Sequence, residues 1–128
     1  ALFTPGSHGS TFAGNPLGAA AGLATLDVIE DENLVANAEA RGEQLRDGIM
    51  ATGNPLFVSV RGRGLLDAVE LKHPCSHAVM NYCLEHGLIV NAVAPNALRF
   101  APPLIVTAQD VDQALAILKD VPTDLPDD

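Results

Sequence analysis

The chain has 128 residues and a formal net charge of −9, with 16 acidic residues against seven lysines and arginines. This length is enough for one domain with a hydrophobic core. The basic residues are scattered and there is no tryptophan, so the sequence lacks the basic and aromatic surface that nucleic-acid binding needs. No apolar run is long enough to span a bilayer and no signal-peptide pattern is recognisable, which predicts a cytoplasmic protein with no membrane partner.

A polar loop precedes the first predicted helix. Residues 8–16 (HGSTFAGNP) bring the hydroxyl groups of Ser10 and Thr11 close to Asn15, a favoured N-cap residue, which is followed by a proline suited to the first helical position. The loop therefore lies at the positive end of a helix predicted over residues 16–30, where hydroxyl and backbone donors suit an anion such as a phosphate. The plainer alternative is that the two hydroxyl residues only form a turn.

The first predicted helix carries a face of small residues. It includes Gly18 and Gly22, each of which weakens a helix by about 1 kcal/mol relative to alanine. Close packing against another helix or subunit would explain them, and ordinary tolerance of glycine is the alternative. A second helix is predicted from Leu34 to about Thr52, before a turn that begins at Gly53.

The rest of the chain alternates short strands with helices. Strands are predicted over residues 57–60 and 65–71, with a bend or bulge at 61–64 between them, and again over 88–93 and 97–100.

Two further helices accompany these strands. Ser76 is a suitable N-cap for the first, which Gly87 ends, and a capping box of Thr107 and Asp110 opens the second. Residues after Asp120 are rich in proline and aspartate and are predicted to be loose.

Together these elements predict an α+β fold, in which a small, mostly antiparallel sheet has helices on one face. The predicted organisation is a functional loop over residues 1–15, a helical segment over 16–52, a small α+β domain over 53–120 and an acidic tail over 121–128. Because the chain begins without methionine and has residues of functional type near its start, we expect it to be a segment of a longer protein.

Histidine and cysteine residues gather around Pro74. His73, Cys75 and His77 are of types that bind zinc, but their spacing matches no common zinc pattern, so exposed histidines and a core cysteine are favoured and no metal site is predicted. If Cys75 and Cys83 lie on one helix, about 12 Å of helical rise separates them, which is too far for a disulfide.

Arginine residues are the main candidates for binding an anion in the second half of the chain. Arg99 lies in an otherwise apolar strand, where its guanidinium needs either a bound carboxylate or a carboxylate of the same protein. Arg61 and Arg63 alternate with glycines, which would let an anion approach, although a surface position explains one of them as well. Neither Lys72 nor Lys119 has a catalytic setting, so the sequence indicates anion contacts without a reactive group.

Three ordered motifs resemble the class III pyridoxal-phosphate aminotransferases: HGSTFAGNPL at residues 8–17, VRGRGLL at 60–66 and LRFAPPL at 98–104. The resemblance covers nearly the whole chain except the acidic tail. Ala13 departs from the family, which usually has glycine there, and this affects only the local geometry of the loop because alanine can replace glycine where φ is negative.

The resemblance implies the aspartate-aminotransferase type of fold (PLP fold type I), with this segment as the C-terminal small domain and the helix leading into it. It implies pyridoxal 5′-phosphate (PLP) as the cofactor, bound to a lysine of the N-terminal large domain upstream of residue 1, so that this segment alone would be inactive. Function would belong to a homodimer, in which Thr11 contacts PLP across the dimer interface. Ser10 would contact the substrate, and Arg99 would lie near the substrate carboxylate.

Within the family, residues 4–9 and 88–93 are most similar to the members that act on N2-acetylornithine in arginine biosynthesis. That reaction converts N2-acetylornithine and 2-oxoglutarate to N-acetylglutamate 5-semialdehyde and glutamate. The ornithine-specific members share the phosphate and arginine motifs and are the close alternative. A stand-alone α+β module that binds small amino acids or anions, and a structural or dimerisation domain, are the alternatives from other functional classes.

Overall fold

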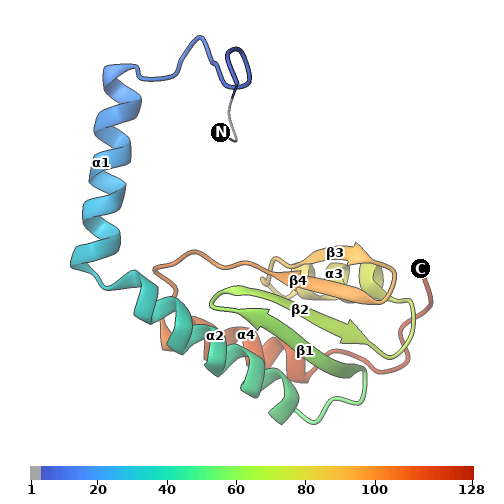
Figure 1. Cartoon of the computed structure of the whole chain (residues 1–128). Coiled ribbons are helices and arrows are strands. Elements are labelled where there is room, and N and C mark those ends of the chain that lie inside the picture. Colours follow the sequence, from blue (N-terminus) through green and yellow to red (C-terminus); the bar gives the residue numbers. More distant parts are fainter. Residues whose placement is uncertain (1–3) are drawn as a thin grey trace. The chain divides into compact units, whose positions relative to one another are not determined.

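The computed structural model describes residues 4–128 and, within them, four helices and four strands (Figure 1). None of these helices is long and apolar enough to cross a membrane. The chain divides into two compact units, Ala1–Leu34 and Val35–Asp128. In chain order the elements are α1 (Pro16–Asp31), α2 (Leu34–Ala51), β1 (Phe57–Arg63), β2 (Leu66–Leu71), α3 (Ser76–Glu85), β3 (Asn91–Ala94), β4 (Ala97–Phe100) and α4 (Ala108–Lys119).

In the N-terminal unit, α1 begins where the sequence predicts. The side chain of Asn15 accepts a hydrogen bond from the backbone N–H of Gly18 at 2.8 Å, and Pro16 occupies the first turn. No residue of α1 is buried in this structure, and its apolar side chains, among them Leu17 and Leu23, are exposed. Packing of its small-residue face against another helix or subunit stays a prediction.

The C-terminal unit is built on a four-stranded antiparallel sheet with the strand order β1-β2-β4-β3. Strand residues alternate between the two faces of a sheet. On one face, Asp67, Val69 and Leu71 of β2 are buried together with Leu98 and Phe100 of β4. The residues between them lie on the opposite face and are exposed or half-buried.

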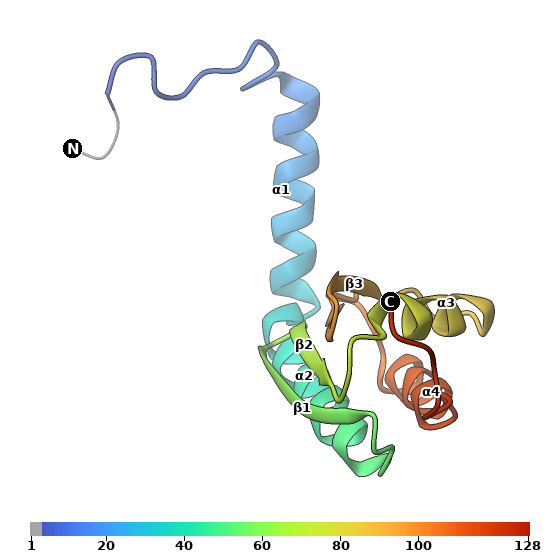
Figure 2. The same cartoon turned by 90° about the vertical axis from the view of Figure 1, so that its right-hand side faces the viewer.

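Helices α2, α3 and α4 cover the buried face of the sheet, which confirms the predicted α+β fold. Figure 2 shows α3 and α4 on the same side of the strands. Both cysteines are buried free thiols, as predicted, and burial raises the pKa of the Cys83 thiol to about 11. Each helix contributes residues to the one hydrophobic core that it shares with the strands: Leu45, Ile49, Val79, Cys83, Val111 and Leu118.

β1 is longer than predicted, because the stretch 61–64 is not a bend or bulge. Residues 61–63 continue the pairing of β1 with β2, and the turn begins only at Gly64, which has φ +57°. A Cβ at Gly62 would lie 2.1 Å from Oδ1 of Asp67, so glycine is needed for the two strands to pair here. The register irregularity lies instead at the start of β1.

β3 is shorter than predicted, because residues 88–90 are not part of the sheet. The N–H of Leu88 donates to the carbonyl of Cys83 near the end of α3 at 2.8 Å, and Val90 is buried in the core. Pairing with β4 therefore begins only at Asn91.

Residues 121–128 are not the loose tail that the sequence predicts. Val121 is buried, and the carboxylate of Asp128 accepts a hydrogen bond from the backbone N–H of His77 at 3.0 Å. Ser76 is the first residue of α3 and not its N-cap, and its hydroxyl donates to Asp128 at 3.0 Å. A carboxylate from a distant part of the sequence thus caps α3 in place of a local side chain.

Helix α2 lies so close to the β1–β2 turn that only glycine fits between them. A Cβ at Gly42 would lie 1.7 Å from the carbonyl oxygen of Gly64. One turn further along α2, Arg46 donates to the same carbonyl at 3.0 Å and to Oδ1 of Asp67 at 2.9 Å. The Asp67 side chain is fully buried and its Oδ2 has no partner among residues 4–128, so burial raises the pKa of Asp67 against the opposing effect of Arg46.

Gly42→Ala is expected to lower the free energy of unfolding by about 1–3 kcal/mol, because the added methyl group forces α2 away from the β1–β2 turn. Chemical denaturation measures the change. Glu43→Ala, at an exposed position of the same helix, is the matched control and should change that free energy by less than about 0.5 kcal/mol. Equal stability of the two variants would contradict the close contact.

The buried Asp67 predicts a pH dependence of stability. A carboxyl group whose pKa is higher in the folded than in the unfolded chain stabilises the fold fully below its ordinary pKa, and this contribution is lost as the pH rises through the raised value. Asp67→Asn cannot ionise and should lose less stability than the wild type between about pH 3 and about pH 7, as measured by denaturation. Asp47→Asn, at an exposed position of α2, should keep the pH dependence of stability of the wild type. An Asp67→Asn variant with the same pH dependence as Asp47→Asn would refute the prediction.

Candidate functional site

The loop before α1 satisfies several of its own polar groups. Oγ of Ser10 accepts a hydrogen bond from the N–H of Phe12 at 3.3 Å, and the carbonyl of Ser10 accepts one from the N–H of Ala13 at 3.2 Å. Nδ2 of Asn15 donates to the carbonyl of Phe12 at 2.7 Å, and Gly14 adopts φ +71°. Ser10 therefore forms a turn, as the plainer alternative predicts, and it is also exposed.

Thr11 is the loop residue best placed to donate to an anion. It is exposed, and no hydrogen bond to its hydroxyl is formed within residues 4–128. The N-terminus of α1 offers fewer free N–H groups than most helix starts, because Pro16 has no N–H and the side chain of Asn15 already accepts from the N–H of Gly18. No acidic residue precedes Asp27 in the sequence, so this donor set of hydroxyl and backbone N–H groups fits a phosphate.

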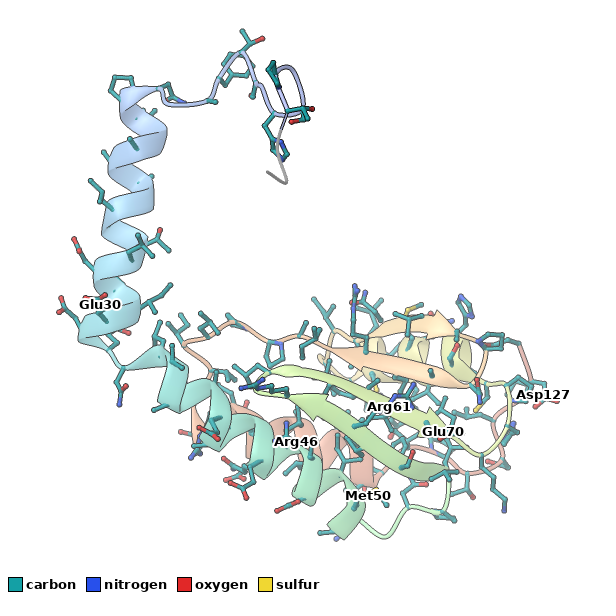
Figure 3. The ribbon with its side chains drawn as sticks, in the orientation of Figure 1. Glu30, Arg46, Met50, Arg61, Glu70 and Asp127 are labelled. Atoms are coloured by element: carbon teal, nitrogen blue, oxygen red, sulfur yellow. The ribbon has the colours of Figure 1, made fainter. Side chains whose placement is uncertain are left out.

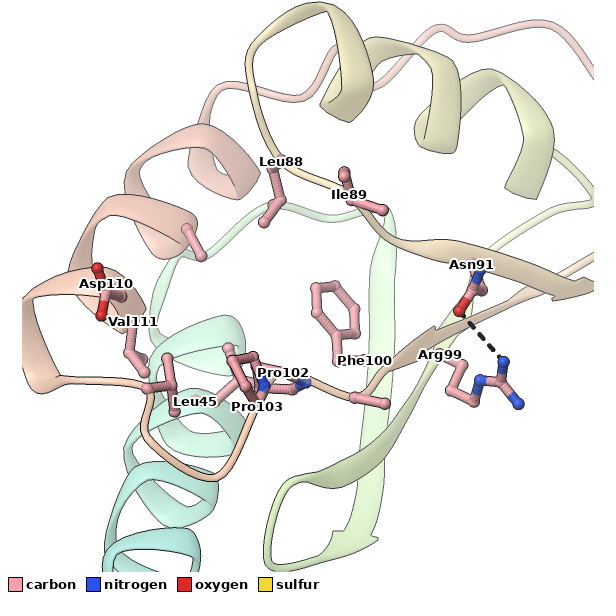
Figure 4. A pocket seen from close by; sticks show the side chains of 13 residues that line it. Leu45, Leu88, Ile89, Asn91, Arg99, Phe100, Pro102, Pro103, Asp110 and Val111 are labelled. Carbon is pink, nitrogen blue, oxygen red and sulfur yellow. Dashed lines mark hydrogen bonds between the residues drawn. The ribbon is translucent and has the colours of Figure 1, made fainter. Parts of the chain in front are cut away.

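Arg99 of β4 lies in the C-terminal unit, on the face of the sheet opposite to the one that α2, α3 and α4 cover. Its Nη2 donates to Oδ1 of Asn91, its cross-strand partner on β3, at 3.2 Å (Figure 4). Within residues 4–128 it makes no salt bridge, so the alternative of an internal ion pair is not observed there. Arg99 is exposed, so its remaining N–H groups can donate to an external carboxylate.

A mainly apolar pocket of about 370 Å³ adjoins Arg99 (Figure 4). Arg99 and Asn91 lie at one end of it and Asp110 at the other. Hydrogen bonds from Thr107 hold Asp110 in the predicted capping box and lower its pKa. The arrangement suits a ligand with an apolar stretch and an anionic end. Its apolar walls come from α2, β4, α4 and the segments before β3 and after β4, among them Leu45, Leu88, Phe100, Pro103 and Val111.

Arg61, which is labelled in Figure 3, and Arg63 lie on the same open face of the sheet as Arg99. Ala68 of β2 pairs with Arg61 on one side and with Arg99 on the other, so the two arginines belong to one row across three strands. Both Arg61 and Arg63 are exposed, and neither forms a salt bridge with a described residue.

The histidines around Pro74 are bound to acidic side chains. Nδ1 of His73 lies 2.7 Å from Oδ1 of Asp127, and Nδ1 of His77 lies 3.0 Å from Oδ2 of Asp128. Within residues 4–128, no three metal-ligating side chains cluster in a way that could hold a metal ion.

Sequence reasoning missed Asn91 as the partner of Arg99, and it missed the pocket beside them. An asparagine in an otherwise apolar predicted strand was the available signal, comparable to the lone arginine. Its meaning depends on the register that places Asn91 opposite Arg99, which local sequence does not specify.

Nearly the whole chain matches one family model. Residues 1–121 match the model described as Aminotransferase class-III. The chain belongs to the class III aminotransferases.

Two curated members of the family show how much of such a protein this chain represents. The acetylornithine aminotransferase of Gloeobacter violaceus is 45% identical over 98% of this chain and 32% of that protein. The ornithine aminotransferase of Staphylococcus carnosus is 46% identical over 94% of this chain and 30% of that protein. The chain therefore spans about a third of the length of these relatives.

A solved family structure shares the fold. The ornithine aminotransferase of Toxoplasma gondii, with PLP at partial occupancy in its active site, matches with a TM-score of 0.79 and 36% identity over 91% of this chain and 28% of that chain. As predicted, the α+β fold is that of a segment of a PLP fold type I aminotransferase.

Proposed function

We propose that this chain is the C-terminal segment of a PLP-dependent acetylornithine aminotransferase, which converts N2-acetylornithine and 2-oxoglutarate to N-acetylglutamate 5-semialdehyde and glutamate in arginine biosynthesis. The observation that carries the proposal is the exposed guanidinium of Arg99, which has an amide partner in Asn91 and adjoins an apolar pocket. All substrates of this reaction carry carboxylates, and arginine binds a carboxylate through two parallel hydrogen bonds. Ornithine is the second candidate amino donor, because a curated ornithine aminotransferase is as similar to the chain as a curated acetylornithine aminotransferase.

In this proposal the loop before α1 contributes to binding the cofactor. PLP, when bound, supplies the electron sink that lets an amino group move between donor and acceptor. Thr11 donates its hydroxyl to the phosphate across the dimer interface, and Ser10 contacts the substrate from the same loop. The absence of acidic residues from this stretch favours an anion there.

Arg99 holds a substrate carboxylate, and Asn91 restricts the orientation of the guanidinium by accepting a hydrogen bond from one of its N–H groups. The reactive lysine belongs to the large domain of the same protein. Lys72 follows the end of β2 and Lys119 ends α4, both exposed, and we assign neither a catalytic role. The active species is then a cytoplasmic homodimer of the full-length protein, and this segment alone is inactive.

The donor preference tests the proposal. In the full-length protein with 2-oxoglutarate as acceptor, kcat/KM should be at least about tenfold higher for N2-acetylornithine than for ornithine, the size expected from one specific polar contact. The reverse preference would support the ornithine alternative. Transamination of neither donor would overturn both.

Thr11→Val should weaken PLP binding by about tenfold or more, because it removes one hydrogen bond to a charged group and keeps the side-chain volume. Equilibrium dialysis of PLP against the full-length protein measures this. Thr25→Val is the matched control, since the Thr25 hydroxyl bonds within α1 to the carbonyl of Ala21, and it should leave PLP affinity unchanged. Unchanged PLP affinity in the Thr11 variant would exclude its phosphate role.

Arg99→Ala should raise KM for 2-oxoglutarate by about tenfold or more while PLP affinity stays at the wild-type level, because a charge-assisted carboxylate contact is lost. Arg99→Lys should recover part of the loss, since lysine keeps the charge but not the two-pronged geometry. Lys119→Ala removes a cation at the end of α4 and serves as the control. A KM in Arg99→Ala that equals the control value would refute the carboxylate role.

A further inference from the structure

The segment between β4 and α4 forms one wall of the pocket beside Arg99. Residues 101–106 (the wall segment) belong to neither a helix nor a strand. The segment starts directly after Phe100, the last residue of β4, so it continues the strand that carries Arg99. A shift of the segment would therefore change the width of the pocket next to the guanidinium. Four of its residues line the pocket, of which the two prolines are labelled in Figure 4: Ala101, Pro102, Pro103 and Val106.

The wall segment has few hydrogen bonds of its own. Its two prolines have no N–H, and within the segment the N–H of Val106 donates to the carbonyl of Pro103 at 3.0 Å. Val106 packs against the core, whereas Leu104 and Ile105 are 41% and 61% exposed. Leu104 also lines a second pocket, of about 360 Å³, together with residues of α2, β1 and the β1–β2 turn. The segment thus adjoins open space at two pockets, so it depends on contacts from other elements to keep its position.

The side chain of Asn37 supplies such contacts from α2. Its Nδ2 donates to the carbonyl of Leu104 at 2.8 Å and to the carbonyl of Val106 at 3.0 Å. A side-chain amide has two N–H donors, so one asparagine can make both bonds. Asn37 is half-buried, and its helix lies in close contact with the β1–β2 turn at Gly42. The two hydrogen bonds therefore tie the wall segment to an element whose own position is fixed.

We propose that Asn37 is a positioning residue for substrate binding, which holds the wall segment where the pocket fits the carbon chain next to the carboxylate that Arg99 binds. This inference rests on the proposed function, in which 2-oxoglutarate is a substrate with such a carboxylate. Asn37 does not line the pocket, so it acts through the wall segment. Loss of its two hydrogen bonds should weaken carboxylate binding without changing the chemistry of amino transfer.

Gln44 provides a matched control on the same helix. Its Nε2 donates to the carbonyl of Ala108 at 3.1 Å and to Oδ1 of Asp112 at 2.7 Å, so it also makes two hydrogen bonds from α2 to a later part of the chain. These bonds reach the start of α4, which the burial of Val111 holds as well, and neither Gln44 nor its two partners line the pocket. A purely structural role of Asn37 predicts that the loss of either amide has the same effect.

The test compares Asn37→Leu with Gln44→Met in the full-length protein with PLP bound, since each variant removes an amide and nearly keeps the side-chain volume. Isothermal titration calorimetry measures the binding of glutarate, a dicarboxylate that has no amino or keto group to react. Asn37→Leu should weaken glutarate binding and raise KM for 2-oxoglutarate, each by about tenfold, because two hydrogen bonds that hold the wall are lost. Its kcat should stay within about twofold of the wild type. Gln44→Met should leave the glutarate affinity and KM at wild-type values.

A conservative variant and amide exchange add two further readouts. Asn37→Gln keeps an amide donor on a longer side chain, so its glutarate affinity should lie between those of the wild type and Asn37→Leu. Hydrogen exchange at the N–H of Val106, which bonds within the wall segment, should be faster in Asn37→Leu than in Gln44→Met. Asn37→Ser, whose hydroxyl lies closer to the backbone than the amide, takes the place of Asn37→Leu if that variant does not fold.

Equal glutarate affinity in Asn37→Leu and Gln44→Met would overturn the positioning role, whether both match the wild type or both are weakened. A fall in kcat with unchanged KM for 2-oxoglutarate would also overturn it, and so would a wild type that binds no glutarate. The proposed function can fail separately. Transamination of neither donor would overturn that function, and the glutarate comparison would still decide the role of Asn37.

Discussion

The close contact between α2 and the β1–β2 turn is the constraint on which the C-terminal unit depends. Glycine at position 42 lets the helix reach the carbonyl of Gly64, and Arg46 then bonds to that carbonyl and to the buried Asp67. Asp67 is fixed on the inner face of β2, so the register of β2 is fixed as well. Because a slip of one residue would turn every side chain of a strand to the other face, this ion pair also determines which residues reach the open face.

The position of Arg99 follows from that register. Ala68 comes directly after Asp67 and pairs with Arg99, so burying Asp67 puts Ala68 and Arg99 on the open face. The same face carries Glu70, which accepts a hydrogen bond from Ser59 at 3.0 Å (Figure 3). A buried ion pair on one side of the sheet thereby fixes the polar residues on the other. Burial of Asp67 costs desolvation, which raises its pKa, and the contact with Arg46 opposes that cost.

The sequence predicted those features that depend on local chemistry. The cap at Asn15, the capping box at Thr107 and the class of fold each follow from a few adjacent residues or from the order of elements. The motifs likewise identified Thr11 and Arg99 as candidates. The predicted bend or bulge at 61–64 was wrong because glycine is typical both of a bulge and of a close approach between neighbouring strands. Only the close approach applies at Gly62.

The remaining errors concern contacts between residues far apart in the sequence. Asp128 caps a helix that begins more than 50 residues earlier, and no local pattern reveals such a partner. Residues 88–90 are apolar and resemble a strand, yet Leu88 bonds to the end of α3. The pocket and the bond between Asn91 and Arg99 also require the assembled sheet. Local cues therefore located the candidate anion contacts but not the surroundings that shape them.

The charge of the chain explains why those surroundings matter. The net charge of −9 repels anions at long range. An anion contact therefore needs donors close to the anion, at distances short enough that salt does not screen the attraction. Around both proposed contacts the sequence contains no acidic residues. No acidic residue precedes Asp27 around the Thr11 loop, and none lies between Glu85 and Asp110 on either side of Arg99. Acidic residues are instead placed on α2 and at the end of the chain, where Asp128 serves as the anion for α3. The proposed anion contacts therefore depend on where carboxylates are absent as much as on where hydroxyl and guanidinium groups are present.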